Sequence, residues 1–319
     1  MNISVIMPTW NNSERLKKTL RGFCRLDTGD IGGWEMIVVD NNSVDNTRNV
    51  VKSFTSLIPV TYKYEPRQGN SIARNTGIRL ASGQLLIFVD DDVTVGENFL
   101  DAYRSGYMEH GDRYFYGGPV LSDFEGSGPP ECVRPYLPKS IGGFDLGDRE
   151  QVFNSKNYLI GANWGAPRMK IIEAGLFNEG LGLGEDGKVS GIGEETDLMG
   201  RLISLGLKGC YLPRAKVFHF VPAAKYSFKH ILKRKERIGF YAGMDEKKSL
   251  GYPLLFGAPR WVFGELLRKG LTLVAFWRAD AMKNLIEMAF LAGFLKGWLR
   301  DGKAGDNEGI DFNSDVQTR

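Results

Sequence analysis

Cysteine is scarce in this chain, and the few cysteines form no pattern. Three occur among 319 residues, Cys24, Cys132 and Cys210, and no two of them stand at a CxxC spacing. A disulfide framework or a cysteine-ligated zinc site therefore has little support. We expect a reducing, cytoplasmic setting.

Long apolar runs are also missing. The first ten residues, MNISVIMPTW, contain neither a basic segment nor a long hydrophobic stretch, so no signal peptide is expected. In the C-terminal third, no charge-free run approaches the roughly 20 apolar residues that span a bilayer. The helices expected there should lie on a surface or pack against protein.

Charge is nearly balanced overall but unevenly distributed. The net charge is +3, and 42% hydrophobic with 25% charged residues is ordinary for a globular protein of one large domain or two coupled ones. Residues 225–304 carry 16 Lys and Arg against 7 Asp and Glu, a balance of +9, whereas residues 1–224 and 305–319 each carry −3. The basic character thus belongs to one segment.

Apolar runs alternate with helical patterns in the first half of the chain. Helices are expected from about residue 13, around residues 50–57 and at 71–81, and strands at 3–7, 35–39, 60–64 and 85–89. The unbroken apolarity of residues 85–89 is typical of a strand buried on both faces. The order predicts an α/β fold with a mostly parallel sheet flanked by helices.

The second half is organised differently. After Tyr116 the alternation gives way to Gly- and Pro-rich sequence, and residues 118–224 are interpreted as a second lobe. A helix is expected to begin near Glu194, because acidic residues in a first turn suit the helix dipole, and Gly206 could end it. From Ala223 onward the sequence predicts helices, first basic and then apolar with scattered charge.

Each predicted strand of the first half is followed by a polar, turn-prone segment. These segments are PTWNN, DNNSVDNT, EPRQGN and DDD, in chain order. Because ligands of parallel α/β sheets collect beyond the carboxyl ends of the strands, the four segments are the first place to look for a site.

The acidic triplet Asp90, Asp91 and Asp92 follows a strand expected to be buried. Three adjacent carboxylates repel one another, and a hard divalent cation such as Mg²⁺ or Mn²⁺ would offset that repulsion. An EF-hand loop is excluded, because its sixth and twelfth positions would be Val95 and Asp101 in place of Gly and Glu. The alternative is that the triplet merely caps a following helix.

A glycine pattern ahead of Glu194 is a weaker candidate for a binding site. Gly182, Gly184 and Gly187 match GxGxxG, but neither a strand before them nor a helix after them is indicated. A loop ahead of Glu194 is the preferred interpretation over a dinucleotide site.

As a set, these segments resemble the family-2 glycosyltransferases. The residues that carry the resemblance are PTWNN, VVDNNSVDNT, GNSIARNTGI with ASG, FVDDDV, GGP, GANWG and GEETDLMGRL, over about residues 3–245. The resemblance implies the Rossmann-like GT-A fold, here with a C-terminal helical extension. It implies a nucleotide-sugar-binding half at 1–117 and an acceptor-binding half with the catalytic base at 118–224. Charge and composition add a basic amphipathic helical region at 225–304 and a disordered tail at 305–319.

The resemblance assigns the donor site to the first strand ends. Pro8, Thr9 and Asn11 would line the nucleotide pocket together with Asn42, and the Asp40 carboxylate would accept hydrogen bonds from the base. Alternatively, Asp40 only ends a strand and begins a turn. Many family members have an acidic residue and Gly-Ser where this chain has NNS, which leaves the base and sugar open, although a UDP-sugar is favoured.

Two arginines and two of the aspartates complete the donor site. Arg67 and Arg74 are the cations best placed for the diphosphate or base, since a guanidinium matches phosphate oxygens, although either could be a surface residue. By resemblance, Asp90 would contact the ribose or a metal-bound water, and Asp91 would belong to the same donor site.

The resemblance also implies a divalent cation, Mn²⁺ or Mg²⁺, bound by Asp92 of a DxD motif. His219 stands where many relatives carry a histidine near the metal, although a lone histidine is often structural. Such a cation would stabilise the charge that grows on the leaving nucleoside diphosphate.

Inverting transfer needs a base for the acceptor hydroxyl. By resemblance this base is Glu195, in the position usually held by an aspartate, with Glu194 on the acceptor side; both could instead only satisfy the helix dipole. Gly161, Asn163 and Trp164 would shape the acceptor site, where an aromatic face could stack on a sugar or simply pack.

Basic residues followed by Trp- and Leu-rich helices near the C-terminus suit an anionic membrane surface. Nucleic acid is not expected, because no groove-reading or base-stacking module accompanies the charge. The alternative is that these helices cover the catalytic domain or form a homo-oligomer interface.

The sequence as a whole predicts a metal-dependent, inverting glycosyltransferase, peripheral on the inner face of the cell membrane, in polysaccharide or cell-surface glycan assembly. Its acceptor would be a glycan or a polyprenyl-linked sugar. The rival interpretations are a nucleotidyl- or phosphotransferase with the same metal site and an inactive sugar-nucleotide-binding partner protein.

Overall fold

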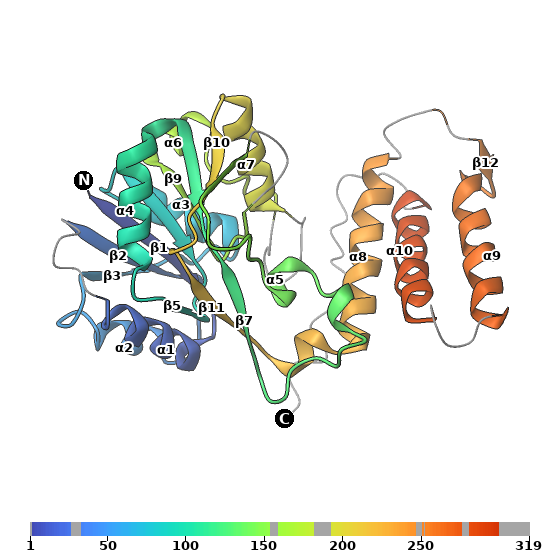
Figure 1. Ribbon diagram of the computed structural model, residues 1–319, viewed down its shortest axis with the longest axis horizontal. Coiled ribbons are helices and arrows are strands. Elements are labelled where there is room, and N and C mark those ends of the chain that lie inside the picture. Colours follow the sequence, from blue (N-terminus) through green and yellow to red (C-terminus); the bar gives the residue numbers. More distant parts are fainter. Residues whose placement is uncertain are drawn as a thin grey trace. The chain divides into compact units, whose positions relative to one another are not determined.

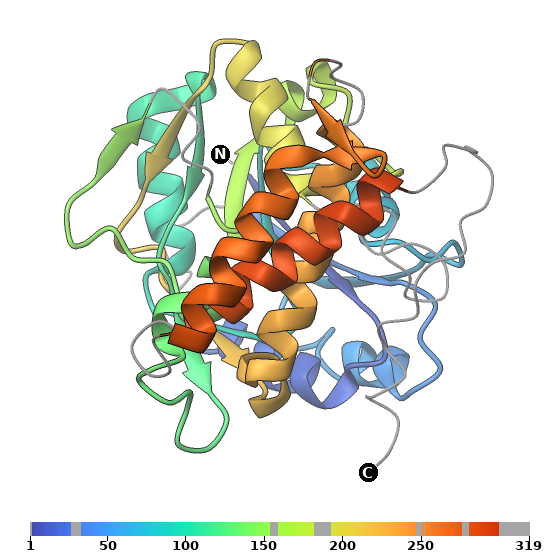
Figure 2. The same ribbon diagram turned by 90° about the vertical axis from the view of Figure 1, so that its right-hand side faces the viewer.

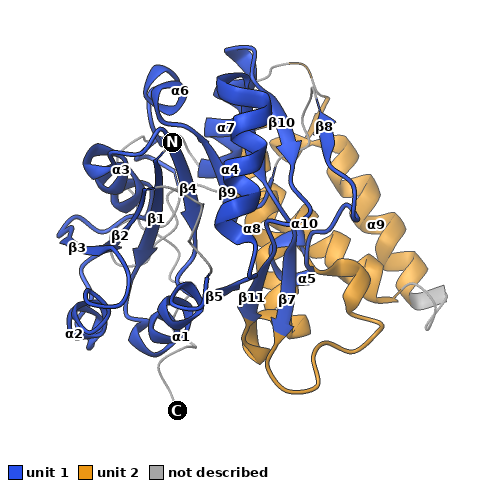
Figure 3. Cartoon of the chain, turned by 60° about the vertical axis from the view of Figure 1, so that its left-hand side comes forward, with its two compact units in different colours: residues 1–123, 138–220, 309–319 blue, residues 124–137, 221–308 orange. Residues whose placement is uncertain are grey.

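The computed structural model describes residues 2–26, 33–153, 159–181, 193–246, 251, 253–275 and 281–299. The described residues form two compact units: residues 2–123 with 138–220, and residues 124–137 with 221–299 (Figure 3). The GxGxxG glycines and the tail at 305–319 lie outside the described residues.

The first unit is built on a central sheet flanked by helices (Figure 1). The sheet has eight strands in the order β3-β2-β1-β4-β9-β6-β10-β8. Strands β3, β2, β1 and β4 run parallel, and β6 and β10 are parallel to each other, whereas β9 and β8 are antiparallel to the strands they pair with. The bounds are β1 Ile3–Thr9, β2 Trp34–Asp40, β3 Val60–Tyr64, β4 Leu85–Val89, β6 Tyr114–Gly117, β8 Gln151–Phe153, β9 Asn163–Pro167 and β10 Lys208–Tyr211. The α/β prediction is confirmed, and both halves of the predicted domain contribute strands to this one sheet.

The helices of this unit flank the sheet. They are α1 Ser13–Phe23, α2 Thr47–Lys52, α3 Asn70–Leu80, α4 Phe99–His110, α5 Lys139–Gly142, α6 Arg168–Glu173 and α7 Glu194–Ser204. Helix α3 packs closely on β1, because a Cβ at Gly77 would lie only 2.5 Å from Ile6 Cγ2. All five side chains of β4 are buried, as its apolar run predicted.

Helix α7 begins and ends as its sequence predicts. Three acidic residues occupy the first turn, where they complement the partial positive charge of the helix N-terminus. After Ser204 the chain turns at Gly206, whose φ of 87° is in the left-handed region, and the Leu207 N–H donates to the Leu202 carbonyl at 3.1 Å. Both ends of α7 therefore lie where the local sequence signals predict them, with Glu194 and Glu195 in the first turn.

A second sheet, in the order β5-β11-β7, follows the acidic triplet. Strand β5 (Val93–Val95) begins directly after Asp92 and pairs antiparallel with β11 (Val217–Val221), and β7 is Val120–Phe124. The alternative that the triplet caps a following helix is wrong, because the next helix, α4, begins only at Phe99.

The second unit contains helices α8 (Phe228–Glu246), α9 (Arg260–Ala275) and α10 (Ala281–Leu299), with α10 packed against both others (Figure 2). A short hairpin, β12 (Leu254–Leu255) and β13 (Ala258–Pro259), precedes α9. Four glycines line the contact of α8 with α10, each at a point where a Cβ would clash with the backbone of the other helix: Gly239, Gly243, Gly293 and Gly297. These glycines let the two helix backbones approach closely.

Replacing Gly293 by Ala should destabilise the second unit. The added methyl group would overlap the carbonyl oxygen of Glu236 on α8, and backbone cannot move aside as a side chain can. We expect a loss of roughly 1–3 kcal/mol in the free energy of unfolding, the usual cost of overpacking. Gly264→Ala on α9 is the matched control, since no atom lies within 4 Å of its Cβ position. There alanine's higher helix propensity should stabilise by up to about 1 kcal/mol. Urea denaturation measures both, and equal effects would contradict the proposed close packing.

Among the helices that the structure describes, none combines the length and the apolar character that crossing a bilayer requires.

Candidate functional site

The carboxyl ends of β1 and β4 are joined through Asp91. Its Oδ2 accepts a hydrogen bond of 2.6 Å from Thr9 Oγ1, and its Oδ1 accepts one of 2.8 Å from Asn12 Nδ2. The Asp91 carbonyl accepts a third from Thr19 Oγ1 at 2.8 Å. Burial and the neighbouring Asp92 raise the pKa of Asp91 to about 7. The hydrogen bond between the Thr9 and Asp91 side chains thus joins the end of β1 to the segment after β4.

Asp40 at the end of β2 is also engaged by its own chain. Its Oδ1 accepts the Ser43 N–H at 2.9 Å and its Oδ2 accepts the Tyr62 hydroxyl at 2.6 Å. The carboxylate lies at one wall of a groove of about 680 Å³, with Arg48 and Tyr64 among the other lining residues. An open groove beside a buried carboxylate is suited to a planar ring with N–H donors.

The loop next to this groove has an unusual backbone. Asn11 and Asn42 both adopt left-handed conformations, with φ of 49° and 69°. The Asn11 Oδ1 accepts the Val44 N–H at 2.8 Å, and the Asn42 Oδ1 accepts the Tyr64 hydroxyl at 2.6 Å. Asparagine tolerates this conformation better than most non-glycine residues. Pro8 is buried within β1.

Arg67 lies on an exposed loop that buried polar residues hold in place. Asn41 donates to the Arg67 carbonyl at 2.7 Å and accepts the Gly69 N–H at 2.7 Å. The Arg67 guanidinium contacts Glu65 at 3.2 Å and Glu179 at 3.4 Å, and its side chain is half exposed. A phosphate would compete with these carboxylates for the guanidinium.

Asp90, Asp92 and His219 converge on one point. One ligand atom from each lies within 4.8 Å of the others, and Asp92 Oδ1 is 3.2 Å from His219 Nε2. The pairing of β11 with β5 brings the histidine here, because His219 is opposite Val93 and the Phe220 N–H donates to the Asp92 carbonyl at 2.9 Å. The two carboxylates offer the oxygen ligands that Mn²⁺ and Mg²⁺ prefer, and the imidazole offers a nitrogen beside them. The sequence-predicted metal residues are therefore brought together.

Arg74 is buried at the centre of a group of charged residues that we call the Arg74 cluster: Arg74, Asp90, Glu194 and Glu195. Its Nη1 lies 2.8 Å from Glu195 Oε1 and 3.3 Å from Glu194 Oε1, and its Nη2 lies 3.4 Å from Asp90 Oδ1. Arg74 is 1% exposed. Its guanidinium therefore faces three carboxylates of its own chain, and in this arrangement it is closed to a diphosphate.

Within the cluster, Glu195 has the environment of a proton acceptor. Burial raises the pKa of the Glu195 carboxyl; Arg74 opposes this rise, while Glu194 and Asp90 add to it. Gly161 lies against this carboxylate, and any Cβ at that position would overlap the Glu195 Oε1 atom. A raised pKa and a fixed orientation are what a general base requires.

Replacing Gly161 by Ala should displace the Glu195 carboxylate while the fold is retained. The clash falls on the end of a side chain, which can rotate away, so stability should change by less than about 1 kcal/mol. If Glu195 is the base, turnover should fall by at least about tenfold, since a misplaced base loses much of its effect. The control is Gly22→Ala on α1, whose Cβ would meet its nearest atom at an ordinary 3.7 Å. Unchanged turnover in Gly161→Ala would contradict this role for the glycine.

Asn163 and Trp164, predicted on the acceptor side, lie in the core. Both are 0% exposed. The Asn163 amide donates to the carbonyls of Pro119 and Ala215 and accepts the Tyr103 hydroxyl, and the Trp164 ring packs against Phe88 at 5.0 Å. Neither side chain is accessible to a sugar here, so the alternative of simple packing fits Trp164.

Several residues of this region were missed by sequence reasoning. They are Asn12, Thr19, Asn41, Tyr62, Glu65 and Asn70, each of which holds a predicted site residue or its loop. Asn12 and Asn41 belong to the polar segments after β1 and β2, so their position was a usable signal. Glu65 and Asn70 belong to the polar segment after β3 and carried the same signal. Tyr62 gave none, because its contact with Asp40 is fixed only by the pairing of β3 with β2.

Comparison with known proteins gives a family match. Residues 4–161 match the family model described as glycosyl transferase family 2, which spans the strand ends from β1 to the segment before β9.

Curated relatives match over shorter stretches. Validoxylamine A glucosyltransferase from Streptomyces hygroscopicus subsp. jinggangensis is 35% identical over 107 residues, which are 33% of this chain and 25% of that protein. The GalNAc(5)-diNAcBac-PP-undecaprenol beta-1,3-glucosyltransferase of Campylobacter jejuni is 34% identical over 186 residues, 56% of this chain and 55% of that protein. The chain thus spans about a quarter to a half of the length of these relatives.

Among solved structures, the mannosyltransferase PcManGT from Pyrobaculum calidifontis, in complex with GDP-Man and Mn²⁺, superimposes with a TM-score of 0.56. It covers 94% of this chain and 88% of its own, at 15% identity. At that identity the likeness establishes the GT-A fold.

Proposed function

Because this chain belongs to glycosyl transferase family 2, we propose that it is a metal-dependent, inverting glycosyltransferase. It transfers a sugar from a nucleoside-diphosphate donor to a hydroxyl group of a glycan or lipid-linked acceptor. The observation that carries the proposal is the Arg74 cluster, which joins the proposed base, Glu195, to Asp90 of the proposed cation site.

The residues at the strand ends fit a divalent cation. Asp90, Asp92 and His219 offer oxygen and nitrogen ligands within 4.8 Å of one another. These three residues would hold Mn²⁺ or Mg²⁺. When bound, the cation offsets negative charge on the donor diphosphate. The PcManGT structure contains Mn²⁺ with GDP-Man, which supports this choice of metal.

The chain's own residues supply the rest of the chemistry. The Glu195 carboxylate takes the proton of the acceptor hydroxyl as the hydroxyl oxygen attacks the anomeric carbon. Arg74 keeps that carboxylate oriented at 2.8 Å, and the same arginine holds Asp90 toward the donor. The base and the donor site are thus coupled through one side chain.

The donor nucleotide is proposed to lie over the groove beside Asp40. Asn11 and Asn42 fix its wall residues Val44 and Tyr64, and Thr9 lies at the end of the neighbouring strand β1. A UDP-sugar is favoured, because a buried carboxylate suits the N–H edge of a uracil. A polyprenyl-diphosphate sugar is the proposed acceptor, supported by the undecaprenol-linked acceptor in the name of the Campylobacter jejuni relative.

One assay tests this function. The purified chain is incubated with Mn²⁺ and a panel of nucleotide sugars, and the released nucleotide is identified by chromatography. Slow release of nucleoside diphosphate, abolished by Asp92→Asn, is the expected result. Release of pyrophosphate or nucleoside monophosphate would identify a nucleotidyl- or phosphotransferase. Donor binding without release, even with acceptor extracts, would identify an inactive binding protein.

The second unit is proposed to bind an anionic membrane surface peripherally, on the inner face. The hairpin formed by β12 and β13 carries Leu254 and Leu255 in its first strand and Phe256 in its turn. Phe256 is 83% exposed. Leu267 and Leu271 on α9 are also exposed. Residues 225–304 have a net charge of +9, which would be attracted to anionic lipid. Exposed apolar side chains on a basic unit suit an interfacial position.

Replacing Phe256 by Asp should weaken binding to phosphatidylglycerol vesicles by about tenfold or more, since burying a phenylalanine contributes about 1.5–3 kcal/mol. Met108→Asp on α4 is the control, because Met108 is similarly exposed but belongs to the first unit. Vesicle flotation measures both variants. Failure of the unchanged chain to float would refute the membrane proposal and leave the transferase assay unaffected.

A further inference from the structure

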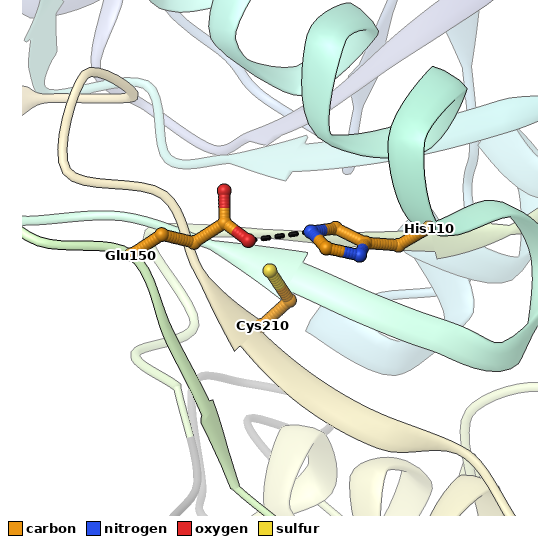
Figure 4. Close-up of side chains that lie close together, drawn as sticks. All are labelled: His110, Glu150 and Cys210. Carbon is orange, nitrogen blue, oxygen red and sulfur yellow. Dashed lines mark hydrogen bonds and ion pairs between the residues drawn. The ribbon is translucent and has the colours of Figure 1, made fainter.

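A second group of metal-ligand side chains lies apart from the Asp90 site. We call it the His110 cluster: His110, Glu150 and Cys210 (Figure 4). The His110 Nε2 lies 2.5 Å from Glu150 Oε1, and one ligand atom from each of the three residues lies within 4.8 Å of the others. Figure 4 shows the Cys210 sulfur pointing toward the space between the carboxylate and the imidazole.

Three separate elements bring these side chains together. His110 is the last residue of α4, Cys210 lies on β10, and Glu150 directly precedes β8. Strand β8 pairs antiparallel with β10, with Val152 opposite Cys210, which brings Glu150 toward the thiol. The Tyr114 ring packs on the imidazole, with ring centroids 5.0 Å apart. The ligand atoms are therefore positioned by the sheet and the helix end, within the first unit.

Nucleophilic or redox chemistry does not suit this cysteine. Cys210 is 0% exposed, and burial, followed by Glu150 and Glu109, raises the pKa of its thiol well above the ordinary value. A thiol that stays protonated is a poor nucleophile. A metal ion, however, replaces the thiol proton, and the partly exposed His110 and Glu150 leave it a route of entry.

We propose that His110, Glu150 and Cys210 bind a zinc ion, with a fourth coordination position open to solvent. One thiolate, one imidazole and one carboxylate form a donor set that Zn²⁺ accepts and that the harder Mg²⁺ and Mn²⁺ do not favour. Three protein ligands with an open position are common for zinc. The proposal does not depend on the proposed transferase activity.

The geometry needs one small adjustment. Zinc–ligand bonds of about 2.0–2.3 Å in a tetrahedron separate the ligand atoms by roughly 3.3–3.7 Å. Glu150 would have to withdraw from His110 by about 1 Å, which the partly exposed Glu150 side chain permits. On binding, the thiol proton leaves to solvent and the thiolate and carboxylate balance the charge of the ion. The bound ion would fasten the edge strand β8 to β10 and α4.

Cobalt(II) provides a direct test, because a thiolate ligand gives a charge-transfer absorption that oxygen and nitrogen ligands do not. The full chain, reduced and held in excess Mg²⁺ to occupy the Asp90 site, is titrated with Co²⁺. We expect the thiolate band to saturate at one Co²⁺ per chain and to disappear when one equivalent of Zn²⁺ is added. Zn²⁺ should also raise the melting temperature.

Matched variants locate the ion. Cys210→Ser should abolish the thiolate band. Glu150→Gln should weaken Zn²⁺ binding by at least about 100-fold, because removing a residue that only supports a ligand already costs up to about 100-fold in metal affinity. Cys24→Ser, at an exposed cysteine, and His219→Ala, at the other cluster, should both keep the band. Because Glu150 is partly exposed, its variant should fold even if Cys210→Ser does not. Absence of the band in the folded chain, its persistence in Cys210→Ser, or unchanged Zn²⁺ affinity in Glu150→Gln would overturn the proposal.

Discussion

Replacing Glu195 by Gln should abolish sugar transfer while donor binding is retained. Glutamine can still accept the hydrogen bond from Arg74, so the cluster should keep its geometry, but the amide cannot take a proton from the acceptor hydroxyl. Loss of a general base lowers turnover by about 10² to 10⁴-fold. Turnover is measured by release of nucleoside diphosphate in the presence of acceptor, and donor binding by calorimetry.

Glu173→Gln is the control for this prediction. Glu173 pairs with Lys170 on the exposed face of α6, so its substitution should leave turnover unchanged. If Glu195→Gln transferred sugar at the rate of the unchanged chain, Glu195 could not be the base. If donor binding were lost as well, its role would be to maintain the cluster.

The same assignment predicts a pH profile. A base acts when deprotonated, and burial raises the pKa of Glu195 above the usual 4.5 of a glutamate. Therefore kcat/KM should fall as the pH drops through that raised pKa, at a higher pH than an ordinary glutamate would give. If kcat/KM fell only at or below pH 4.5, Glu195 would not be the base.

Replacing Arg74 by Met should cost about 3–5 kcal/mol in the free energy of unfolding at neutral pH, because the buried carboxylates of Glu194 and Glu195 lose their counter-ion. Transfer should also be lost, since the same arginine orients the proposed base and Asp90. Methionine has a similar length, so little of the effect would come from a cavity.

The pH dependence of this variant identifies the cause. Without Arg74, the pKa of Glu195 in the folded state, already raised, should rise further. A carboxyl group whose pKa is raised by folding favours the folded state at low pH, and that stability is lost as the pH rises through the folded-state pKa. The loss of unfolding free energy in Arg74→Met, relative to the unchanged chain, should therefore become smaller as the pH is lowered from neutral toward 4.5.

Arg79→Met is the matched control on the same helix. Its side chain is 54% exposed, and its ion pair with Glu179 is long, at 3.7 Å. An exposed pair of this kind contributes little, so the substitution should change stability by less than about 0.5 kcal/mol. Thermal denaturation from pH 4.5 to 8 compares the two variants. A deficit in Arg74→Met that did not vary with pH would contradict the electrostatic explanation.

Local patterns in the sequence predicted the elements and the edge of the sheet where the site lies. The apolar run Leu85–Val89 became a fully buried strand, and the acidic first turn and Gly206 marked both ends of α7. Such features depend on neighbouring residues alone, so periodicity and helix-end chemistry reveal them. The family resemblance predicted Asp92 and His219 as metal ligands, which stays a prediction, and strand pairing brings the two side chains together.

The sequence by itself thus determined the α/β fold, the family and the strand-end position of the candidate site. Only the tertiary structure decided what the charged side chains contact. The sequence predicts Arg74 as a ligand of the diphosphate or base, but the side chain is buried against Glu194 and Glu195, which lie some 120 positions later in the chain. Cys210 formed no motif, yet the end of α4 and the pairing of β8 with β10 place it beside His110 and Glu150. Contacts between residues so far apart follow from strand register and helix packing, which no local pattern encodes.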